Sequence, residues 1–415
     1  MQSNYKQIGE FIQLVYNRNS ELKNLPLIGV TVNKKFIPSV ANTIGTNMKT
    51  YKLIKKDQFA CSLMQVRRDG KIPVALMKED EAIISQAYPV FEIVDTSKLL
   101  PQYLMMWMSR SEFDREACFY AVGGVRGSLE WEDFCAMELP IPSIEKQKEI
   151  VKEYHTITDR IKLNEQLNQK LEDTAQAIYK DWFVDFEFPN VDGKPYKSSG
   201  GEMVYCDELD IEIPKKWKNF KFEDITKKII SHRGKSKDHL EFSIKDKEYK
   251  NPIISAMNVN NGKLVKHEKI KYVKDMTLFN WMKEPLVYDD IILTSEAPLG
   301  EMLLISKRKN YLLSQRLFGI RTDKKKCSGV FLYFWLQTPI AKRDLESRAS
   351  GTTVMGIKLS ELKKIKVLIP EMKVMESFTD KVFKILNIKE SKEIENEKLN
   401  EFKEISLSKI ATIKD

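Results

Sequence analysis

The chain has 415 residues, a length that favours two or more domains. Of these residues 42% are hydrophobic, 10% aromatic and 31% charged, which is typical of a folded globular protein. Its net charge of +9 favours a polyanionic partner. No apolar run reaches the roughly 18 residues of a membrane helix, and the N-terminus does not resemble a signal peptide. The five cysteines are scattered without a C-x-x-C pair. These features predict a reduced cytoplasmic protein without a membrane segment or a zinc site.

Residues 1–142 predict a first domain of mixed α/β structure. Short β-rich runs such as Leu25–Val32 alternate with turn residues, and Gln102–Met108 is typical of a short buried helix. We expect Trp107 to be a core residue.

A long helix is predicted over residues 143–183. Ser143 suits the N-cap position, and neither Gly nor Pro interrupts the segment, which ends before Pro189. At 1.5 Å per residue it would be about 60 Å long. The predicted apolar seam of this helix consists of Ile157, Ile161, Leu167, Leu171 and Ile178.

Residues 184–370 predict a turn-rich connector followed by a second mixed domain, and residues 371–415 predict a second long helix. Its apolar seam consists of Phe378, Val382, Ile385, Leu399 and Phe402. Because neither helix can bury its seam on itself, the simplest arrangement packs the two together as a coiled coil. The alternatives are that each helix packs on its neighbouring domain or pairs with another protein.

An internal repeat of about 228 residues relates the two halves of the chain, because segments in the first half match segments in the second in the same order. The segments Tyr103–Trp107, Gly123–Arg126, Leu129–Phe134 and Leu139–Pro142 match Phe331–Trp335, Ser350–Thr353, Ile357–Leu362 and Val367–Pro370, and Ile84–Gln86 matches Leu313–Gln315. The chain therefore alternates domain, helix, domain, helix.

The most specific motifs surround the first helix. The segments Leu139–Gln147, Ala177–Phe186, Tyr196–Met203 and Ile213–Trp217 resemble conserved regions of the specificity subunits of type I restriction–modification systems. Through its architecture the resemblance covers essentially the whole chain. The second helix departs from the pattern, because Pro370–Lys373 lacks the Glu-Gln pair expected there.

The resemblance implies an α+β protein in which two target-recognition domains are held apart by an antiparallel pair of helices. Each domain would read half of a split site in double-stranded DNA. The helices would act as a ruler and dock two methyltransferase subunits, which bind S-adenosylmethionine and methylate adenine N6. Restriction or translocase subunits would join that complex to cut unmodified DNA.

No catalytic motif is recognisable in the sequence, so we expect a subunit without catalytic residues, metal or cofactor of its own. The nearest approach to a methyltransferase motif, at Asn251–Ile254, lacks the second proline and the aromatic residue, and no phosphate-binding glycine loop is present. We interpret Asp289 and Asp290 as a solvated turn. Two alternatives stay open: an enzyme that both recognises and modifies DNA, and a coiled-coil scaffold that binds no nucleic acid.

The second domain carries most of the positive charge. Residues 184–370 contain 35 Lys and Arg against 25 Asp and Glu, whereas residues 1–142 contain 17 against 16. Lysines and arginines bind phosphates, and Arg, Asn and Gln read base edges. The predicted DNA contacts in the first domain are Lys34, Lys35, Arg67, Arg68, Lys71, Gln86 and Arg126. Those in the second domain are Arg233, Lys235, Asn258, Asn260, Lys263, Gln315, Arg316, Thr352 and Thr353. The ordinary alternative for each is a solvated surface side chain.

Overall fold

A computed structural model describes residues 5–41, 45–64, 66–121, 127–232, 251–273, 282, 284–305 and 311–413. The chain divides into two compact units. Unit 1 comprises Met1–Glu165 and Ile394–Asp415, and unit 2 comprises Gln166–Glu393. Each unit therefore contains one predicted domain together with part of both long helices.

Unit 1 contains two four-stranded sheets, in the orders β2-β9-β6-β7 and β4-β3-β8-β5, and a separate antiparallel pair, β1 and β10. Strands β3 and β8 are parallel, and the other pairings are antiparallel. The strands are β1 (Tyr5–Gln7), β2 (Ile12–Leu14), β3 (Leu27–Val30), β4 (Phe36–Pro38), β5 (Lys52–Lys55), β6 (Phe59–Cys61), β7 (Val74–Leu76), β8 (Glu81–Ile84), β9 (Val90–Ile93) and β10 (Glu138–Pro140). The short helices are α1 (Val66–Asp69), α2 (Pro101–Met108), α3 (Ser111–Tyr120) and α4 (Trp131–Ala136).

Unit 2 contains an antiparallel sheet in the order β14-β22-β19-β20, a sheet in the order β18-β15-β21, and the pair β13 and β23. Two hairpins, β11–β12 and β16–β17, complete its described strands. The strands are β11 (Met203–Cys206), β12 (Ile211–Pro214), β13 (Lys218–Lys221), β14 (Thr226–Ser231), β15 (Asn251–Ile254), β16 (Val259–Asn260), β17 (Lys263–Leu264), β18 (Lys271–Val273), β19 (Ile291–Thr294), β20 (Met302–Leu304), β21 (Leu312–Leu313), β22 (Leu317–Thr322) and β23 (Lys366–Ile369). The short helices are α6 (Phe222–Ile225), α8 (Gly329–Trp335), α9 (Pro339–Ser347) and α10 (Leu359–Leu362).

The internal repeat predicted from the sequence is confirmed by this topology. The sheet β2-β9-β6-β7 has the same strand connections as β14-β22-β19-β20, and the parallel pair β3–β8 has its counterpart in β15–β21. Helices α2, α3 and α4 occupy the same places in chain order as α8, α9 and α10. The fold class is therefore the predicted one: two mixed α/β domains and two long helices.

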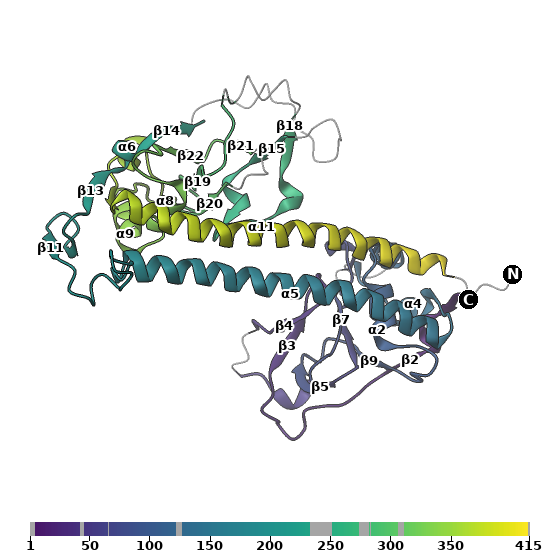
Figure 1. The fold of residues 1–415 in the computed structure, drawn as a ribbon. Coiled ribbons are helices and arrows are strands. Elements are labelled where there is room, and N and C mark those ends of the chain that lie inside the picture. The colour runs from purple at the N-terminus through teal and green to yellow at the C-terminus, as the bar shows by residue number, and fades with distance from the viewer. Residues whose placement is uncertain are drawn as a thin grey trace. The chain divides into compact units, whose positions relative to one another are not determined.

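The long helices are α5 (Ile144–Phe183) and α11 (Met372–Lys409), and Figure 1 shows them in teal and yellow. They run antiparallel within each unit. In unit 1 Arg160 pairs with Glu395, and in unit 2 Glu172 pairs with Lys389. No helix in the described ranges is both long and apolar enough to cross a membrane.

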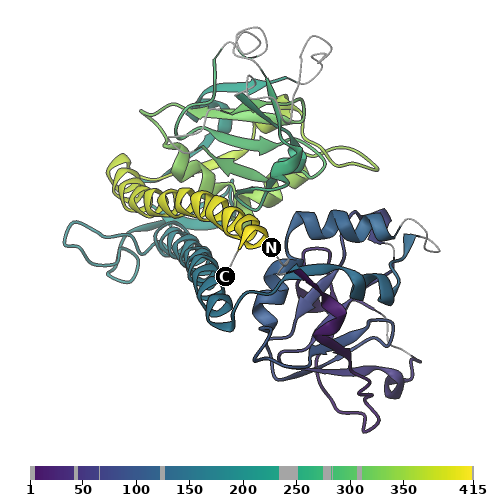
Figure 2. The same cartoon turned by 90° about the vertical axis from the view of Figure 1, so that its right-hand side faces the viewer.

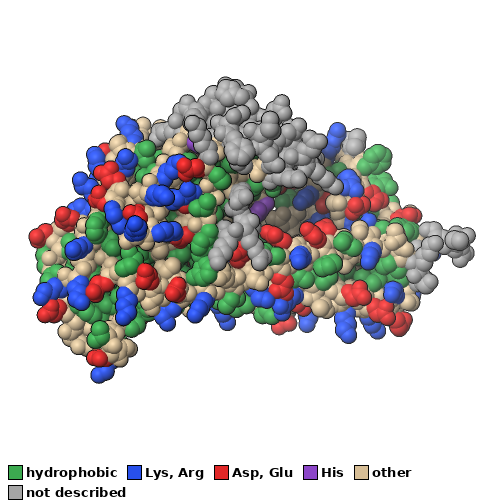
Figure 3. Space-filling model, turned by 45° about the horizontal axis from the view of Figure 1, so that its top comes forward, with side chains coloured by type: hydrophobic (Ala, Val, Ile, Leu, Met, Phe, Trp, Pro, Cys, Tyr) green, Lys and Arg blue, Asp and Glu red, His purple; other side chains and the backbone are tan. Residues whose placement is uncertain are grey.

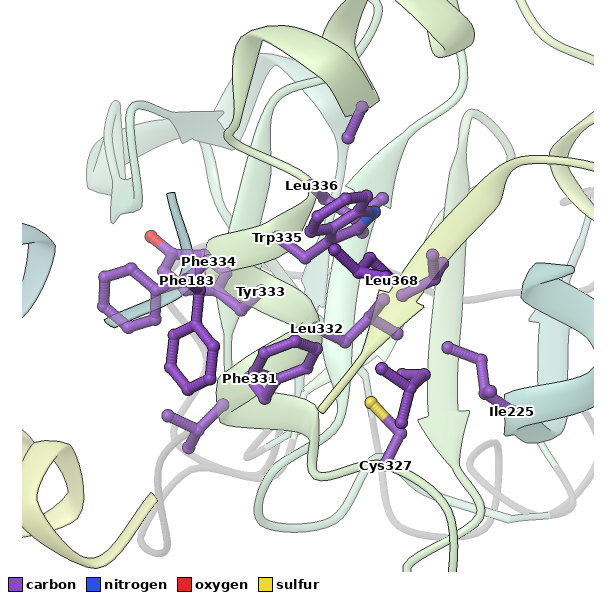
Figure 4. Close-up of a cluster of buried hydrophobic side chains, with 14 of the residues drawn as sticks. Phe183, Ile225, Cys327, Phe331, Leu332, Tyr333, Phe334, Trp335, Leu336 and Leu368 are labelled. Carbon is purple, nitrogen blue, oxygen red and sulfur yellow. The ribbon is translucent and has the colours of Figure 1, made fainter. Parts of the chain in front are cut away.

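Aromatic side chains anchor the end of α5 in the core of unit 2. Figure 4 shows Phe183 of α5 beside Phe331 and Phe334 of α8. Phe183 packs edge-on against Phe331 with ring centroids 5.0 Å apart, and it packs in the same way against Phe378 of α11 at 4.9 Å. Both helices therefore share one core with the domain of unit 2.

The other end of the helix pair belongs to the core of unit 1. Leu407 and Ile410 are buried there, and Tyr154 of α5 packs against the same cluster. The hydroxyl of Tyr5 donates to the carbonyl of Ala411 over 2.9 Å, which ties the first described strand, in purple, to the residues that follow α11, in yellow (Figure 2).

Candidate nucleic-acid interface

Two arginines of unit 1 project from the short helix α1 into solvent. The thiol of Cys118 on α3 donates to the carbonyl of Val66 over 3.5 Å, which holds α1 against α3. A Cβ on Gly127 would lie only 2.9 Å from the Cβ of Arg67, so glycine allows the backbone there to lie close to this arginine. Arg68 pairs with Asp69 at 2.8 Å. Arg67 is exposed and has no ion pair within the described part of the chain, so its charge is available to a phosphate or a guanine.

An exposed aromatic pair stands at the end of α3, and the sequence analysis missed it. Phe119 is 75% exposed and Tyr120 38% exposed. Their rings are 5.9 Å apart at 75°. The available signal was their position three residues before the segment Gly123–Arg126, which the internal repeat matches to Ser350–Thr353.

The structure contradicts the DNA contact that the sequence predicted for Lys34. Its ammonium forms a 2.7 Å ion pair with Asp114, and the side chain is only 9% exposed. It also donates to the carbonyl of Met108. Burial lowers the pKa of Lys34, opposed by the hydrogen bond and charge of Asp114. The prediction is wrong for Lys34, because its charge is used inside unit 1, whereas the next residue, Lys35, is exposed.

Gln86 and Lys71 are exposed, as a DNA contact requires. Gln86 lies two residues after the end of β8, between Ser85 and Ala87, which line a hollow of about 220 Å³. Tyr51 and Tyr88 also line this hollow. Gln86 therefore lies at the rim of a surface recess whose walls include aromatic rings.

In unit 2, the turn between β19 and β20 brings several predicted residues together. The amide of Glu301 donates to the Thr294 hydroxyl over 2.8 Å, which closes the turn. Glu296 on this turn pairs with Arg316 at 3.1 Å and forms a β-bridge with Gly356. Arg316 and the loop 350–356 therefore meet at one place, and the Arg316 side chain remains 62% exposed.

The loop 350–356 is closed by two backbone hydrogen bonds between Ser350 and Gly356, at 2.8 and 3.0 Å. Gly351 has a φ of +133°, and a Cβ there would lie 2.1 Å from the carbonyl oxygen of Val354, so the turn requires glycine. Thr352 and Thr353 are exposed on this loop, as a DNA contact requires. Gln315, which precedes Arg316 in the chain, is half-buried.

The structure also contradicts the DNA contact predicted for Asn258, because this residue is only 1% exposed and its side chain forms hydrogen bonds within unit 2. Its carbonyl oxygen accepts from the amide and the hydroxyl of Ser255, and its amide group donates to the carbonyls of Val265 and Lys266. This amide group closes the β16–β17 hairpin. Asn260 and Lys263, on the same hairpin, are exposed.

Asp289 and Asp290 are buried, which contradicts the interpretation as a solvated turn. Asp289 accepts from the first two amides of α8, at Gly329 and Val330, and pairs with Lys324. Asp290 pairs with Arg321 at 2.7 Å, and this hydrogen bond raises the pKa of Arg321. Both carboxylates therefore stabilise unit 2. No group of three His, Cys, Asp or Glu side chains that could hold a metal ion occurs among the described residues.

Many lysines of unit 2 have their charge balanced by a neighbouring carboxylate. Figure 3 shows blue basic side chains interspersed with red acidic ones on the described surface of unit 2. Ion pairs join Lys228 to Glu284 at 2.7 Å and Lys216 to Glu371 at 3.2 Å. The lysines in these ion pairs are therefore less available to phosphates than unpaired ones. Arg126, Arg233 and Lys235, three further predicted contacts, lie outside the described residues.

The seam of the helix pair is apolar at its ends and polar near its middle. In unit 1 the amide of Asn164 donates to the Asn396 carbonyl oxygen over 2.8 Å, and Asn164 is 2% exposed. In unit 2 the buried ion pair of Glu172 with Lys389 has side chains only 15% and 12% exposed.

The predicted seam residues divide according to this pattern. Leu167 and Phe402 are 36% and 57% exposed, so the prediction is wrong for these two. Their positions follow the apolar stripe of the sequence, but the polar residues Asn164 and Asn396 occupy the contact. The other predicted seam residues are buried or half-buried: Phe378 and Val382 are buried, and Ile157, Ile161, Leu171, Ile178, Ile385 and Leu399 are half-buried.

Three comparisons place this arrangement among known proteins. Residues 4–173 and 214–404 match the family model described as the type I restriction modification DNA specificity domain. The HindI specificity subunit of Haemophilus influenzae is 23% identical over 92% of both chains. The MjaIX specificity subunit of Methanocaldococcus jannaschii is 24% identical over 66% of this chain and 59% of its own length. The fold resembles the crystal structure of a type I restriction–modification S subunit from M. genitalium, with a TM-score of 0.58, 14% identity and coverage of 99% and 96% of the two chains.

Proposed function

Since this chain belongs to the type I restriction modification DNA specificity family and is a specificity subunit, we propose that each unit reads one half of a bipartite site in double-stranded DNA. The observation that carries the proposal is the duplication. Two domains with the same strand connections are joined by two continuous helices. A split site needs two reading surfaces at a fixed separation, and helices without internal glycine or proline are stiff spacers.

The reading surfaces that we propose are the exposed groups gathered in each unit. In unit 1 these are Arg67 and Gln86, whose donors suit guanine and adenine edges. In unit 2 they are Arg316 and the threonines of loop 350–356. The two sets differ in chemistry, so we expect the two half-sites to differ in sequence.

We propose that the helix pair also docks two N6-adenine methyltransferase subunits. Leu163 and Leu167 lie one turn apart on α5 and are 55% and 36% exposed. On α11, Phe402 and Ile405 are 57% and 48% exposed. Exposed apolar pairs on a helix are suited to a protein partner. Restriction or translocase subunits would join the complex through the methyltransferases.

In this proposal the chain has no catalytic residue, and the partner subunits bind S-adenosylmethionine. The buried Asp289 and Asp290, which have ion-pair partners, support this division, because saturated carboxylates are poor metal ligands or bases. Isothermal titration of S-adenosylmethionine into the isolated chain should show no binding, and titration into the assembled complex should show it. Since its substrate would be the chromosome, we propose that the complex works in the cytoplasm.

The deciding experiment is single-molecule methylation sequencing of a host that carries the methyltransferase gene with or without this chain. We expect a split motif of N6-methyladenine that is lost without the chain. Salt-dependent binding of the purified complex to that motif should follow. Absence of both methylation and DNA binding would favour the coiled-coil scaffold, and methylation by the chain alone would favour a stand-alone enzyme.

A further inference from the structure

In the domain of unit 1, residues 5–142, the described phenylalanines other than Phe119 are buried or half-buried, so the exposed pair Phe119–Tyr120 stands out there. Four other phenylalanines of that unit, Phe59, Phe91, Phe113 and Phe134, are at most 1% exposed, whereas Phe119 is 75% exposed. Its ring lies edge-on to Tyr120 with centroids 5.9 Å apart. The adjoining residues, Cys118 and Ala121, are held by the fold: Cys118 bonds to the Val66 carbonyl, and Ala121 is fully buried. The aromatic pair therefore stands on a fixed base.

The internal repeat shows that the framework does not require these two rings. At the repeat spacing of about 228 residues, the buried Phe113 and Ala117 match the buried Ala341 and Leu345 of α9. Phe119 and Tyr120 then match Ser347 and Arg348. In unit 2 Arg348 forms a 2.7 Å ion pair with Asp344. The buried positions of the helix are thus occupied by apolar residues in both units, whereas the aromatic pair belongs to unit 1 alone.

The basic side chains on and after α1 indicate which kind of ligand would suit the rings of Phe119 and Tyr120. Cys118 on α3 bonds to α1, which carries the exposed Arg67 and Arg68, and the exposed Lys71 follows directly. Asp69 pairs with Arg68, and Arg67 is without an ion pair in the described ranges. Phe119 and Arg67 each adjoin one partner of the Cys118–Val66 hydrogen bond. An exposed ring and an available cation on two helices joined in this way suit a ligand that has both anionic groups and π faces, which is the chemistry of a nucleic acid.

We propose that Phe119, supported by Tyr120, packs against a nucleobase of the half-site read by unit 1, while Arg67 holds the adjoining backbone phosphate. This inference rests on the proposed function and names a residue that determines specificity within it. An aromatic side chain inserted at a base step contacts the base face and partly unstacks the step. Removing an aromatic side chain that stacks on a base, by substitution with alanine, weakens the affinity for nucleic acid by about 5- to 150-fold.

The test is a binding titration of the specificity–methyltransferase complex with a fluorescein-labelled duplex that carries the methylated site found by sequencing. Phe119→Ala should weaken binding by about 5- to 150-fold. It should leave the salt dependence unchanged, because no charge is removed. Arg67→Ala should weaken binding and reduce the slope of log affinity against log salt by about one. The matched control is Tyr205→Ala, an exposed aromatic residue of the β11–β12 hairpin, at 59% exposure, and it should bind like the wild type.

An abasic scan across the half-site identifies the contacted base. At one position the abasic duplex should bind wild type and Phe119→Ala equally, because the partner of the ring is gone. Equal affinity of Phe119→Ala and wild type for the intact site would overturn the inference and leave the proposed function standing. Loss of methyltransferase assembly in Phe119→Ala, measured by mass photometry, would overturn it in favour of a protein contact. Failure of the wild-type complex to bind the site would refute both proposals.

Discussion

The hydrogen-bonded pair Asn164–Asn396 in the helix seam predicts that replacing one asparagine costs more stability than replacing the other. Asn164 is 2% exposed and donates to Asn396 over 2.8 Å. Asn396 is half-buried and keeps a second bond, to the carbonyl of Ile161 at 3.4 Å. Asn396→Leu leaves the Asn164 amide buried without its acceptor, which costs about 1–3 kcal/mol. Asn164→Leu leaves Asn396 within reach of water, so we expect a cost of about 1 kcal/mol or less.

The double variant Asn164→Leu/Asn396→Leu removes both polar groups and should be close to wild type in stability. The coupling free energy between the two sites should then be about 0.5–3 kcal/mol. Hydrogen exchange over residues 157–165, read by mass spectrometry, measures the free energy of opening of this part of α5. Equal costs for the two single variants, or a double variant no more stable than Asn396→Leu, would refute the reasoning.

The same double variant tests what sets the register of the helices. The aromatic contacts of Phe378 with Tyr179 and Phe183, at 5.5 and 4.9 Å, anchor the pair in the core of unit 2. Truncating a buried phenylalanine costs about 3–5 kcal/mol, which exceeds the contribution of one asparagine pair. We therefore expect methylation sequencing of the double variant to give the wild-type spacer between half-sites. A new spacer length would show that the asparagines define the register.

Three further predictions follow from the described contacts. Lys34→Met leaves Asp114 buried without its cation, so we expect it to lower the free energy of thermal unfolding by about 3–5 kcal/mol. The control Lys35→Met should change that free energy by no more than about 0.5 kcal/mol. A similar effect of both variants would contradict the buried ion pair. Phe378→Ala should cost about 3–5 kcal/mol in urea unfolding, and a loss below about 1 kcal/mol would mean that α11 is not part of that core. Leu163→Asp should reduce methyltransferase assembly, measured by mass photometry, without altering DNA binding by the chain, and unchanged assembly would place docking elsewhere.

The architecture could be predicted from the sequence because it depends on long patterns. Uninterrupted stretches without glycine or proline predicted both long helices, and the observed α5 begins at Ile144, next to the predicted Ser143. The matched segments at about 228 residues predicted the duplication, because several matches in the same order are not expected by chance; the pair that contains Trp107 and Trp335 belongs to the buried framework. These signals are repeated along the chain, so a single exceptional residue does not obscure them.

The candidate site was less predictable because burial of a polar side chain depends on partners far away in sequence. Lys34 meets Asp114 across 80 residues, and Asp290 meets Arg321 across 31. A charged residue gives the same local signal whether it is solvated or ion-paired in a core. Phe119 was missed because an aromatic residue at the end of a helix is usually buried in a core, and the sequence alone does not show that this one is exposed.

The exposed and buried positions of the repeat suit our proposal that one fold reads two different half-sites. Matched positions that are buried keep their apolar character: Trp107 and Trp335 are 4% and 2% exposed, and Leu139 and Val367 are both fully buried. Matched positions at the surface diverge, as Phe119 and Ser347 do. If the exposed set contacts DNA, as we propose, surface substitutions would change the sequence that is read at little cost in stability, because the buried set holds the strands. The two units therefore share a framework, and the proposal predicts that substitutions at the exposed positions of one unit leave the half-site of the other unchanged.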